Sequence, residues 1–338
     1  MAVAQAQPPV LAVEGLSVTI RTPAGPLHAV RDASFGVHRG ETVCLVGESG
    51  CGKSMTSLAI MDLLPPTAKR QARRLAFAGT DLARASRAEV NALRGNRMAM
   101  IFQEPMTALN PAWTIGEQLI EVYRRHKRSS HSEARDRAID LLAKVGIASP
   151  AERLGQYPHQ LSGGLRQRVM IAMALMCGPD LIIADEPTTA LDVTIQAQIL
   201  RLLKSLQREF GIALLLITHD LGVVARIADH VHVMYAGAIV ESATTKELFA
   251  HPCHPYTRGL LSCLPRSGVI ESGTRLGTIP GVVPSLIGGI EGCAFRSRCQ
   301  HARAGCAEAL PVRFPSTTHR YVCVEDFSAT AKLGEAMA

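Results

Sequence analysis

The segment "GESGCGKS", residues 47–54, decides the fold. It matches the pattern G-x-x-x-x-G-K-[ST], in which the backbone N–H groups of a glycine-rich turn surround the phosphates of a nucleotide. The apolar run "TVCLVG" (42–47) before it is typical of a buried strand, and "MTSLAIMDLL" (55–64) after it has helical periodicity. A strand, this turn and a helix are the context that a P-loop requires, so we predict a nucleoside triphosphate site here.

Each residue type in this loop has a chemical task. The glycines let backbone N–H groups turn inward, and the helix that begins near Lys53 presents its positive end to the same anion. The Lys53 ammonium is expected to neutralise γ-phosphate charge, and the Ser54 hydroxyl to be a ligand of Mg²⁺. The predicted ATP-binding residues are Gly47, Glu48, Ser49, Gly50, Cys51, Gly52, Lys53, Ser54 and Met55.

A second strand supplies carboxylates. In "LIIADEP" (181–187), four apolar residues typical of a buried parallel strand are followed by Asp185 and Glu186. Open α/β sheets bind their ligands at the carboxyl ends of strands, so Asp185 is the expected partner of Mg²⁺. Glu186 is expected to polarise the water that attacks the γ-phosphate, and we predict that it is the catalytic base.

Composition limits the kind of protein. With 338 residues, 47% of them hydrophobic and 19% charged, the chain can form one large domain and an appendage. The N-terminus lacks the pattern of a signal peptide, and the apolar run "VMIAMALMCG" (169–178) is too short to span a bilayer, so we expect a soluble, cytosolic protein. The net charge is +7, and basic residues cluster in "KRQARR" (69–74) and "RRHKR" (124–128), which we interpret as solvated faces.

Four of the nine cysteines lie close together in the sequence, three in "GCAFRSRCQHARAGC" (292–306) and the fourth at Cys323. An odd number of cysteines and a reducing cytosol disfavour structural disulfides. The spacing is longer than that of common zinc knuckles and differs from ferredoxin patterns. Zinc, an iron–sulfur centre and free thiols therefore remain open on spacing alone.

Three further motifs complete a pattern: "LSGGLRQR" (161–168), "TALD" (189–192) and "LITHD" (216–220). Together with the P-loop and "LIIADEP", they resemble the nucleotide-binding subunits of ATP-binding cassette (ABC) proteins in order and spacing. The resemblance implies an α/β fold of the P-loop NTPase type, with a RecA-like core, an antiparallel β subdomain and a helical subdomain. It also implies that two cassettes close face to face, with each ATP between the P-loop of one and the LSGG segment of the other.

The resemblance assigns roles to further residues. Gln103, in "MIFQEPMTALNP" (100–111), resembles the glutamine that senses metal and water, and His219 resembles the switch histidine at the γ-phosphate. With Glu186 they form the predicted catalytic set. Asp192 resembles the aspartate at the dimer interface, and Ser54, Gln103 and Asp185 are the expected Mg²⁺ ligands. The signature residues that would act on the opposing subunit's ATP are Leu161, Ser162, Gly163, Gly164 and Gln167. The aromatic residue on which the family stacks adenine is absent, and Ile20 stands near its place.

Fine detail resembles one subfamily. "FQEPMTALNP" (102–111), "HPYTRGLL" (254–261) and "IPGVVPSL" (279–286) are similar to the ATPase subunits of bacterial dipeptide and oligopeptide importers. This implies an ATP hydrolase coupled to transport. Its expected partners are a second related ATPase subunit in a heterodimer, two membrane-spanning permease subunits and an external peptide-binding protein, with no nucleic acid. Its expected place is the cytoplasmic face of the bacterial inner membrane.

Two alternative functions share parts of this pattern. Importers of nickel or other small solutes share much of it, so an ATPase of such an importer is the first alternative. A nucleic-acid-associated ABC ATPase is the second. The short stretch between Lys53 and Ser162 has no room for the long coiled coil of repair cassettes, and the chain has one ATPase unit where translation cassettes have two.

The resemblance also implies a division of the chain. Residues 1–245 are expected to be the nucleotide-binding domain, with a helical subdomain at about 104–178, and residues 246–338 a peptide-importer-type extension. In some members of the subfamily, four cysteines of this extension hold a [4Fe–4S] cluster. On that basis we predict a [4Fe–4S] centre on Cys293, Cys299, Cys306 and Cys323, with Zn²⁺ as the alternative ion.

Overall fold

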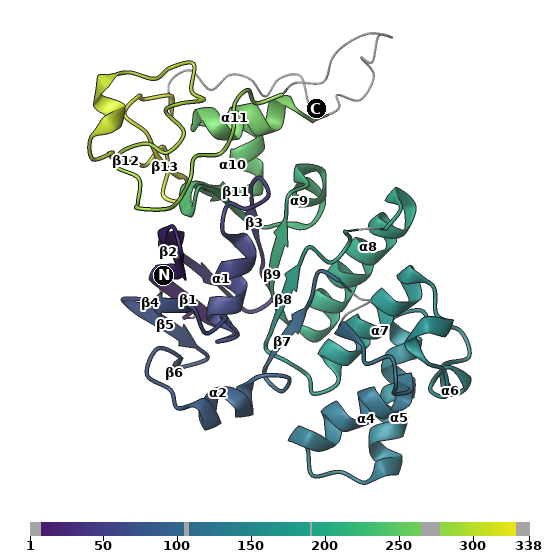
Figure 1. Ribbon diagram of the computed structural model, residues 1–338. Coiled ribbons are helices and arrows are strands. Elements are labelled where there is room, and N and C mark those ends of the chain that lie inside the picture. The colour runs from purple at the N-terminus through teal and green to yellow at the C-terminus, as the bar shows by residue number, and fades with distance from the viewer. Residues whose placement is uncertain (1–7, 105–107, 190, 265–277, 329–338) are drawn as a thin grey trace, which may run out of the picture. The chain divides into compact units, whose positions relative to one another are not determined.

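The computed structural model describes residues 8–104, 108–189, 191–264 and 278–328 (Figure 1). The chain forms two compact units, each built from separate stretches of sequence. The first consists mainly of residues 36–42 and 76–217, and the second of residues 12–35, 43–75 and the chain from Thr218 onward. Among the described residues, no helix is both long and apolar enough to cross a membrane.

The first unit contains a parallel sheet of three strands. β7 (Met98–Ile101) pairs with β8 (Leu181–Asp185), which pairs in turn with β9 (Ala213–Thr218). Every residue of β8 and β9 is buried, as expected for parallel strands covered on both faces. The long helix α8 (Val193–Phe210) connects β8 to β9, so both strands end at the same edge of the sheet.

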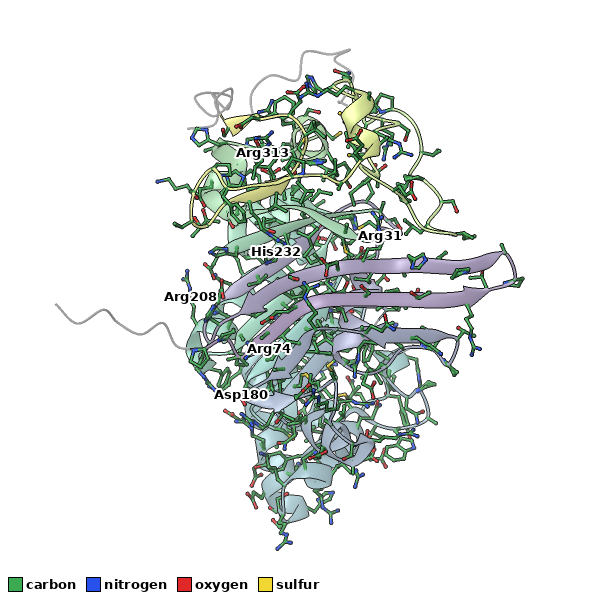
Figure 2. The ribbon with its side chains drawn as sticks, turned by 90° about the vertical axis from the view of Figure 1, so that its left-hand side faces the viewer. Arg31, Arg74, Asp180, Arg208, His232 and Arg313 are labelled. Atoms are coloured by element: carbon green, nitrogen blue, oxygen red, sulfur yellow. The ribbon has the colours of Figure 1, made fainter. Side chains whose placement is uncertain are left out.

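Charged residues anchor the start of this sheet. Asp180, labelled in Figure 2, lies immediately before β8 and accepts hydrogen bonds from Arg39 and from Nε of Arg97, the latter at 2.7 Å. Arg97 lies immediately before β7. The two parallel strands therefore begin at a shared ion pair.

Helices make up most of the sequence between β7 and β8. The helix α4 (Ile115–His126) begins at Thr114 and α5 (His131–Lys144) at Ser130; the side chain of each capping residue accepts a hydrogen bond from a first-turn N–H. α5 buries alanines and leucines at helical spacing, on the side that contacts α4 and α7. Further helical segments described between these strands are α6 (Pro150–Arg153), η1 (Pro158–Gln160) and α7 (Gly163–Leu175), and α2 (Arg87–Leu93) precedes β7.

The second unit contains the strand that leads into the P-loop. β3 (Thr42–Val46) pairs in parallel with β10 (His230–Tyr235), and β10 pairs antiparallel with β11 (Ala238–Thr244). Two short strands from the C-terminal part of the chain add to this sheet: β13 (Arg320–Val322) pairs with β11, and β12 (Val312–Arg313) pairs with β13. Through β12 and β13, the C-terminal segment, defined as the chain from residue 246 onward, thus extends the sheet that carries the nucleotide loop.

The other strands and short helices come from both units. The strands are β1 (Leu11–Thr22), β2 (Gly25–Val37), β4 (Ala68–Gln71), β5 (Arg74–Phe77) and β6 (Thr80–Asp81). The helices are α1 (Lys53–Ile60), α9 (Leu221–Ile227), α10 (Thr245–Ala250), α11 (Pro255–Ser262) and η2 (Ala304–Ala307). β4 pairs with β1.

Candidate active site

The P-loop has a shape that only glycine permits at two of its positions. A Cβ atom on Gly47 would lie 2.1 Å from the carbonyl oxygen of Met234, and one on Gly52 would lie 2.2 Å from that of Ala29. Both glycines also have positive φ angles, 157° and 105°. A side chain at either position would require the neighbouring backbone to move, so the loop depends on close approach to β2 and β10.

Lys53 lies at the centre of the loop. Its side chain is buried, and its Nζ donates hydrogen bonds to the carbonyl oxygens of Gly47 at 2.9 Å and Glu48 at 3.0 Å. The helix α1 begins at Lys53, and its N-cap, Gly52, has no side chain to accept from the first-turn N–H groups. The loop therefore surrounds an ammonium group at the positive end of a helix, an arrangement suited to a polyphosphate.

Glu48 forms hydrogen bonds within the protein through both its main chain and its side chain. Its N–H donates to the hydroxyl of Tyr256 at 2.9 Å, and its two carboxylate oxygens accept from Arg298 at 2.7 and 3.0 Å. Tyr256 lies on α11, and Arg298 lies between Cys293 and Cys299. Our sequence reasoning missed both residues as supports of the P-loop. The only signals were the "HPYTRGLL" segment and the position of an arginine inside the cysteine-rich stretch.

The predicted carboxylates and glutamine lie together in the first unit. Asp185 is the buried last residue of β8, and the amide of Gln103 donates to Glu186 Oε2 at 3.3 Å. Thr189 Oγ1 donates to the same oxygen at 2.9 Å. The N–H of Glu186 donates to the carbonyl of Ile217 at 2.9 Å, which ties the end of β8 to β9.

Glu186 has a backbone conformation that side chains rarely adopt. Its φ angle is 45°, in the left-handed region. Such a conformation outside glycine costs about 1–3 kcal/mol and is found mostly at functional sites. The structure holds it with the Ile217, Thr189 and Gln103 hydrogen bonds, and the turn directs the carboxylate toward Gln103.

The signature residues form the start of α7. Ser162 is the N-cap, and its hydroxyl accepts from the N–H of Leu165 at 3.4 Å. Ser162 and Gly163 are exposed, whereas Leu161 and Gln167 are buried and hold the segment against the protein. The segment therefore exposes small polar groups at the N-terminus of a helix. Gly164 packs against Ile195 of α8, where a Cβ would lie 3.0 Å from Cγ2.

The remaining predicted residues are Asp192 at the start of α8, His219 after β9 and Ile20 on β1. Asp192 is the exposed N-cap of α8 and accepts from the N–H of Ile195 at 2.9 Å. His219 follows β9 and is exposed in the second unit. Ile20 is half-buried on β1. The structure therefore joins Gln103 with the carboxylates in one unit and assigns the P-loop and His219 to the other.

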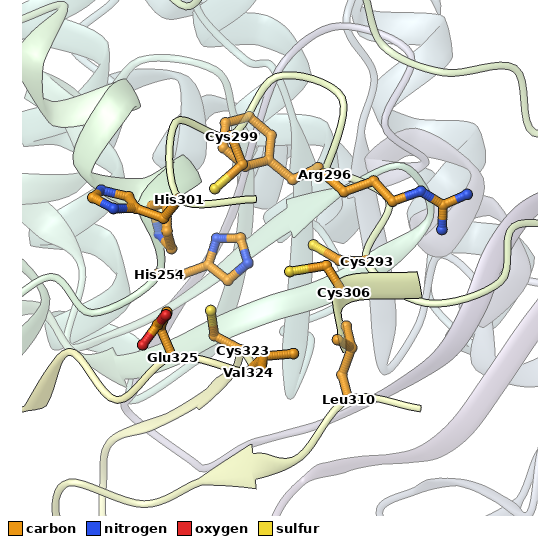
Figure 3. A pocket seen from close by; sticks show the side chains of 12 residues that line it. His254, Cys293, Arg296, Cys299, His301, Cys306, Leu310, Cys323, Val324 and Glu325 are labelled. Carbon is orange, nitrogen blue, oxygen red and sulfur yellow. The ribbon is translucent and has the colours of Figure 1, made fainter. Parts of the chain in front are cut away.

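The four clustered cysteines line one cavity in the C-terminal segment. Cys293, Cys299, Cys306 and Cys323 surround it together with His254, and Figure 3 shows their sulfur atoms around the His254 imidazole. All four are free thiols. Burial raises the pKa of Cys293 to about 11 and also raises the pKa values of Cys299 and Cys323. Burial lowers the pKa of His254 to about 4, so this imidazole is neutral at pH 7.

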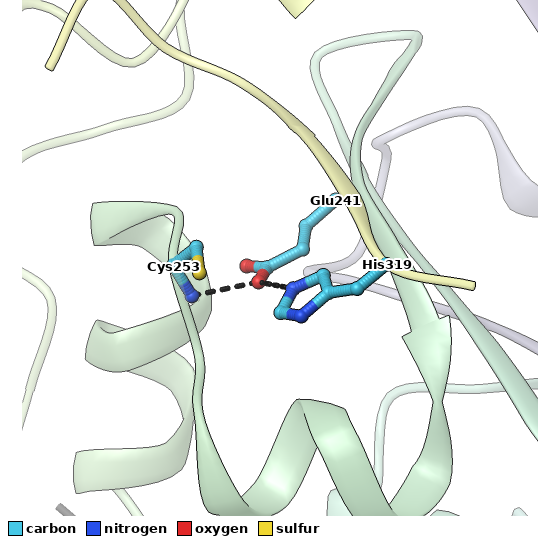
Figure 4. Close-up of side chains that lie close together, drawn as sticks. All are labelled: Glu241, Cys253 and His319. Carbon is cyan, nitrogen blue, oxygen red and sulfur yellow. Dashed lines mark hydrogen bonds and ion pairs between the residues drawn. The ribbon is translucent and has the colours of Figure 1, made fainter. Parts of the chain in front are cut away.

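A second group of potential metal ligands belongs to the second unit and is fully buried. Ligand atoms of Glu241, Cys253 and His319 lie within 4.8 Å of one another, and this is the single such group among the residues described (Figure 4). The Glu241 carboxylate already accepts from His319 Nε2 at 2.8 Å and from the N–H groups of Cys253 at 2.7 Å and His254 at 2.9 Å. These bonds favour a structural role: they tie β13 and the start of α11 to β11.

Comparison with known proteins agrees with this fold and loop. Residues 30–189 match the model of the family described as ABC transporter, and residues 240–306 match that described as oligopeptide/dipeptide transporter, C-terminal region. The chain is similar to the dipeptide transport ATP-binding protein DppD of Bacillus subtilis, with 52% identity over 89% of this chain and 90% of that one. It is also similar to the oligopeptide transport ATP-binding protein OppD of the same organism, with 48% identity over 92% of this chain and 87% of that one.

Solved structures give the same result. The ATP-binding cassette MJ0796, in a dimeric post-hydrolysis state bound to ADP and Pi, superposes with a TM-score of 0.63 and 26% identity, covering 70% of this chain and 98% of that one. The fold and nucleotide loop therefore define an ATP-hydrolysing cassette of the ABC transporter family, which confirms the predicted fold class. Within that family, the chain belongs to the ATP-binding subunits of dipeptide and oligopeptide ABC importers.

The prediction of an iron–sulfur centre is wrong on these findings. The relatives that match nearly the whole chain are named as ATP-binding transport proteins, and nothing in those names indicates a [4Fe–4S] cluster. Among the described residues, the group of ligand atoms close enough to hold one ion is Glu241, Cys253 and His319, not the four cysteines. The four cysteines line one cavity with the buried His254, and their closeness in the sequence was not sufficient evidence for an iron–sulfur site.

Proposed function

We propose that this subunit powers the import of di- or oligopeptides through membrane-spanning partner subunits, at the cytoplasmic face of the bacterial inner membrane. The observation that supports this most is the C-terminal segment: it matches the oligopeptide/dipeptide region, and its strand β13 pairs with β11, which pairs with β10, the neighbour of the P-loop strand β3. We propose residues 1–245 as the nucleotide-binding domain, with a helical subdomain at about 104–178, and residues 246–338 as the importer-specific extension. The extension would then be part of the ATPase rather than a separate appendage.

Within the site, the chain's own residues have distinct roles in this proposal. The P-loop residues Gly47–Met55 bind the phosphates, with Lys53 neutralising charge. Glu186 accepts a proton from the attacking water, and Gln103, hydrogen-bonded to it, orients that water. His219 contacts the γ-phosphate.

The donors proposed for Mg²⁺ fit a hard cation, because they are all oxygen atoms. They are the Ser54 hydroxyl, the Gln103 amide oxygen and the buried carboxylate of Asp185. When bound, Mg²⁺ would offset charge on the phosphate oxygens. The carboxylate of Asp185 lies at the carboxyl end of β8, the position where α/β sheets bind ligands.

A second cassette would complete the site. The exposed Ser162 and Gly163 at the start of α7 present N–H groups suited to the γ-phosphate held by an opposing subunit, and the exposed Asp192 would lie at the same interface. The MJ0796 cassette is dimeric in its solved structure. We propose a heterodimer with a second, related ATPase subunit.

A groove on α4 is the proposed contact for the membrane-spanning partners. It is lined by Trp113, Glu117, Ile120, Glu121, Arg124, Arg125 and His131. Trp113, the single tryptophan of the chain, is 41% exposed. Exposed aromatic side chains are typical of interaction surfaces. A short amphipathic helix from a partner would bury it, and an external peptide-binding protein would take part through the complex.

Reconstitution tests the proposed solute class. The subunit would be expressed together with candidate partners from the same organism, namely a second cassette, two permeases and a binding protein, and the assembled complex placed in liposomes. We expect ATP hydrolysis to increase when the binding protein carries di- or oligopeptides. Stimulation by nickel or another small solute, with none by peptides, would support the alternative importer and contradict the peptide proposal. Specific binding of nucleic acid by the complex would contradict both.

A further inference from the structure

Arg298 of the C-terminal segment contacts the P-loop through a complete set of hydrogen bonds. Its guanidinium donates to both carboxylate oxygens of Glu48, from Nη1 at 2.7 Å and from Nη2 at 3.0 Å. Its remaining donors reach the carbonyl oxygens of Pro280 at 2.9 Å and Ile279 at 3.0 Å, and the hydroxyl of Tyr235 at 3.5 Å. All five N–H groups of the guanidinium therefore have an acceptor.

This pair is more shielded from solvent than an ordinary surface ion pair. The Arg298 side chain is 4% exposed and that of Glu48 is 28% exposed. The guanidinium carbon lies 5.8 Å from the ring centre of Tyr235 and 5.9 Å from that of Phe295, close enough for cation–π attraction. Bidentate pairs of this kind restrict geometry as well as adding energy, because the planar guanidinium fits the carboxylate in one orientation.

A second contact restrains the same residue of the loop. The N–H of Glu48 donates to the Tyr256 hydroxyl at 2.9 Å, and the Tyr256 ring packs against Phe295 with ring centres 5.4 Å apart. Glu48 is thus held at its main chain by α11 and at its side chain by Arg298. Both supports come from the chain beyond residue 245, more than 200 positions away in sequence.

Restraint of Glu48 matters because the loop has little stiffness of its own. Glycines at 47, 50 and 52 have positive φ angles and impose few steric limits on the backbone. The carbonyl oxygens of Gly47 and Glu48 are the acceptors of the Lys53 ammonium, so a shift of Glu48 moves the group that neutralises phosphate charge.

We propose that Arg298 is a positioning residue for ATP, which acts through Glu48 and makes the C-terminal segment a working part of the nucleotide site. Without Arg298, the Glu48 carboxylate loses its partner and the loop samples conformations that bind phosphate less well. The loss would then appear as weaker ATP binding by a chain that remains folded. This inference rests on the P-loop being the ATP site, which the proposed function assigns.

The test measures ATP affinity of the full chain by displacement of a fluorescent ATP analogue, with thermal unfolding followed in parallel. We expect Arg298→Met to raise the Kd for ATP about tenfold, the effect of losing a charge-assisted hydrogen-bonded pair. Arg298→Lys restores the charge and not the two parallel bonds, so it should remain clearly weaker than wild type. In the assembled transporter, the same variants should raise the KM for ATP more than they lower kcat.

Arg313→Met is the matched control. Arg313 also anchors the C-terminal segment, donating to the carbonyl oxygens of Cys323 at 3.0 Å and Val324 at 2.6 Å and pairing with Asp326 at 3.4 Å, with no contact to the P-loop among these bonds. It should lower the melting temperature and leave the Kd for ATP within about twofold of wild type. Equal losses of affinity in Arg298→Met and Arg313→Met would show a general structural effect and overturn the proposal.

Two further variants separate the proposal from its premise. The double variant Glu48→Gln with Arg298→Met should have about the same Kd for ATP as the single variant with the higher Kd, because each single substitution already breaks the same ion pair. Fully additive losses, or wild-type affinity in folded Arg298→Met, would overturn the role of Arg298. Lys53→Ala tests the site itself: unchanged ATP binding in that variant would refute the P-loop assignment, whatever Arg298 does.

Discussion

The amide of Gln103 donates a hydrogen bond to the carboxylate of Glu186 across 3.3 Å, and the two residues are 83 positions apart in sequence. Gln103 follows β7, Glu186 follows β8, and these strands are parallel neighbours. The pairing therefore brings the two side chains to one edge of the sheet. A water molecule oriented by the amide would face a carboxylate able to accept its proton, which is the basis of the first prediction.

Glu186→Gln should leave ATP binding intact and lower hydrolysis about 10²-fold or more, because proton transfer from water contributes at least that factor. The measurement is single-turnover hydrolysis in the assembled transporter, alongside ATP affinity. Glu209→Gln is the control, since Glu209 forms a surface ion pair with Lys144 at 2.6 Å. Turnover by Glu186→Gln close to that of wild type would show that another residue is the base.

The isolated subunit should be a poor ATPase, because the exposed signature segment is expected to act on the ATP of an opposing cassette. Ser162→Arg places a bulky cation at the N-terminus of α7, where it opposes the helix dipole and blocks the approach of a phosphate. ATP binding at the variant's own P-loop should persist, while hydrolysis at the partner's site falls. Full activity from a sample shown to be monomeric by light scattering would refute this prediction.

Gly52→Ala should abolish tight ATP binding. The added Cβ would lie 2.2 Å from the carbonyl of Ala29, a contact that forces backbone movement of the loop or of β2. Gly50→Ala is the matched comparison: its φ angle is also positive, at 75°, and the Cβ that alanine adds would meet no atom within 4 Å. It should cost about 1 kcal/mol of conformational strain and retain measurable affinity. Similar ATP affinity in the two variants would contradict the steric argument.

Glu241→Ala should destabilise the second unit by about 3–5 kcal/mol, because it leaves His319 and two buried backbone N–H groups without their acceptor. Urea unfolding would measure the loss, and hydrogen exchange should show early opening of β13. Glu308→Ala, at an exposed position of the same segment, should change stability by less than about 0.5 kcal/mol. Equal stability of the two variants would mean that Glu241 does not anchor the extension.

Stability should fall as the pH decreases below about 6.5. His232, labelled in Figure 2, lies on β10 and shares a hydrogen bond of 2.8 Å with Ser242; burial, with Arg320 and His230 nearby, lowers its pKa to about 3. Between pH 6.5 and 3 the unfolded chain binds a proton that the native state does not, so acid favours unfolding. At higher pH the histidine is neutral in both states and the effect is absent.

His232→Gln keeps a polar partner for Ser242 and removes this titration. Thermal unfolding between pH 7 and 4 should therefore show a shallower decline for the variant than for wild type. Some decline should remain, because the pKa of buried His254 is also lowered, to about 4. Identical pH profiles for the two proteins would contradict the assignment to His232.

Much of the site was predictable because its motifs are local. The P-loop, the strand that ends at Asp185 and the signature helix each depend on steric and hydrogen-bonding preferences of adjacent residues, which are written in consecutive positions. Glycine at 47 and 52, an apolar strand before each functional turn, and serine as the N-cap of α7 are readable without a fold. The predicted fold class followed from these motifs and their order.

The tertiary structure alone decided which distant residues meet. Arg298 reaches Glu48 across 250 positions and Glu241 reaches His319 across 78, because β11 and β13 pair and carry the end of the chain toward the P-loop strand. The cysteines also show what sequence alone leaves undetermined. Their spacing indicated a common location, and the structure lines one cavity with them, but the iron–sulfur prediction failed. Proximity in sequence brings side chains to one region, whereas the chemistry there depends on the directions, burial and partners that only the folded chain sets.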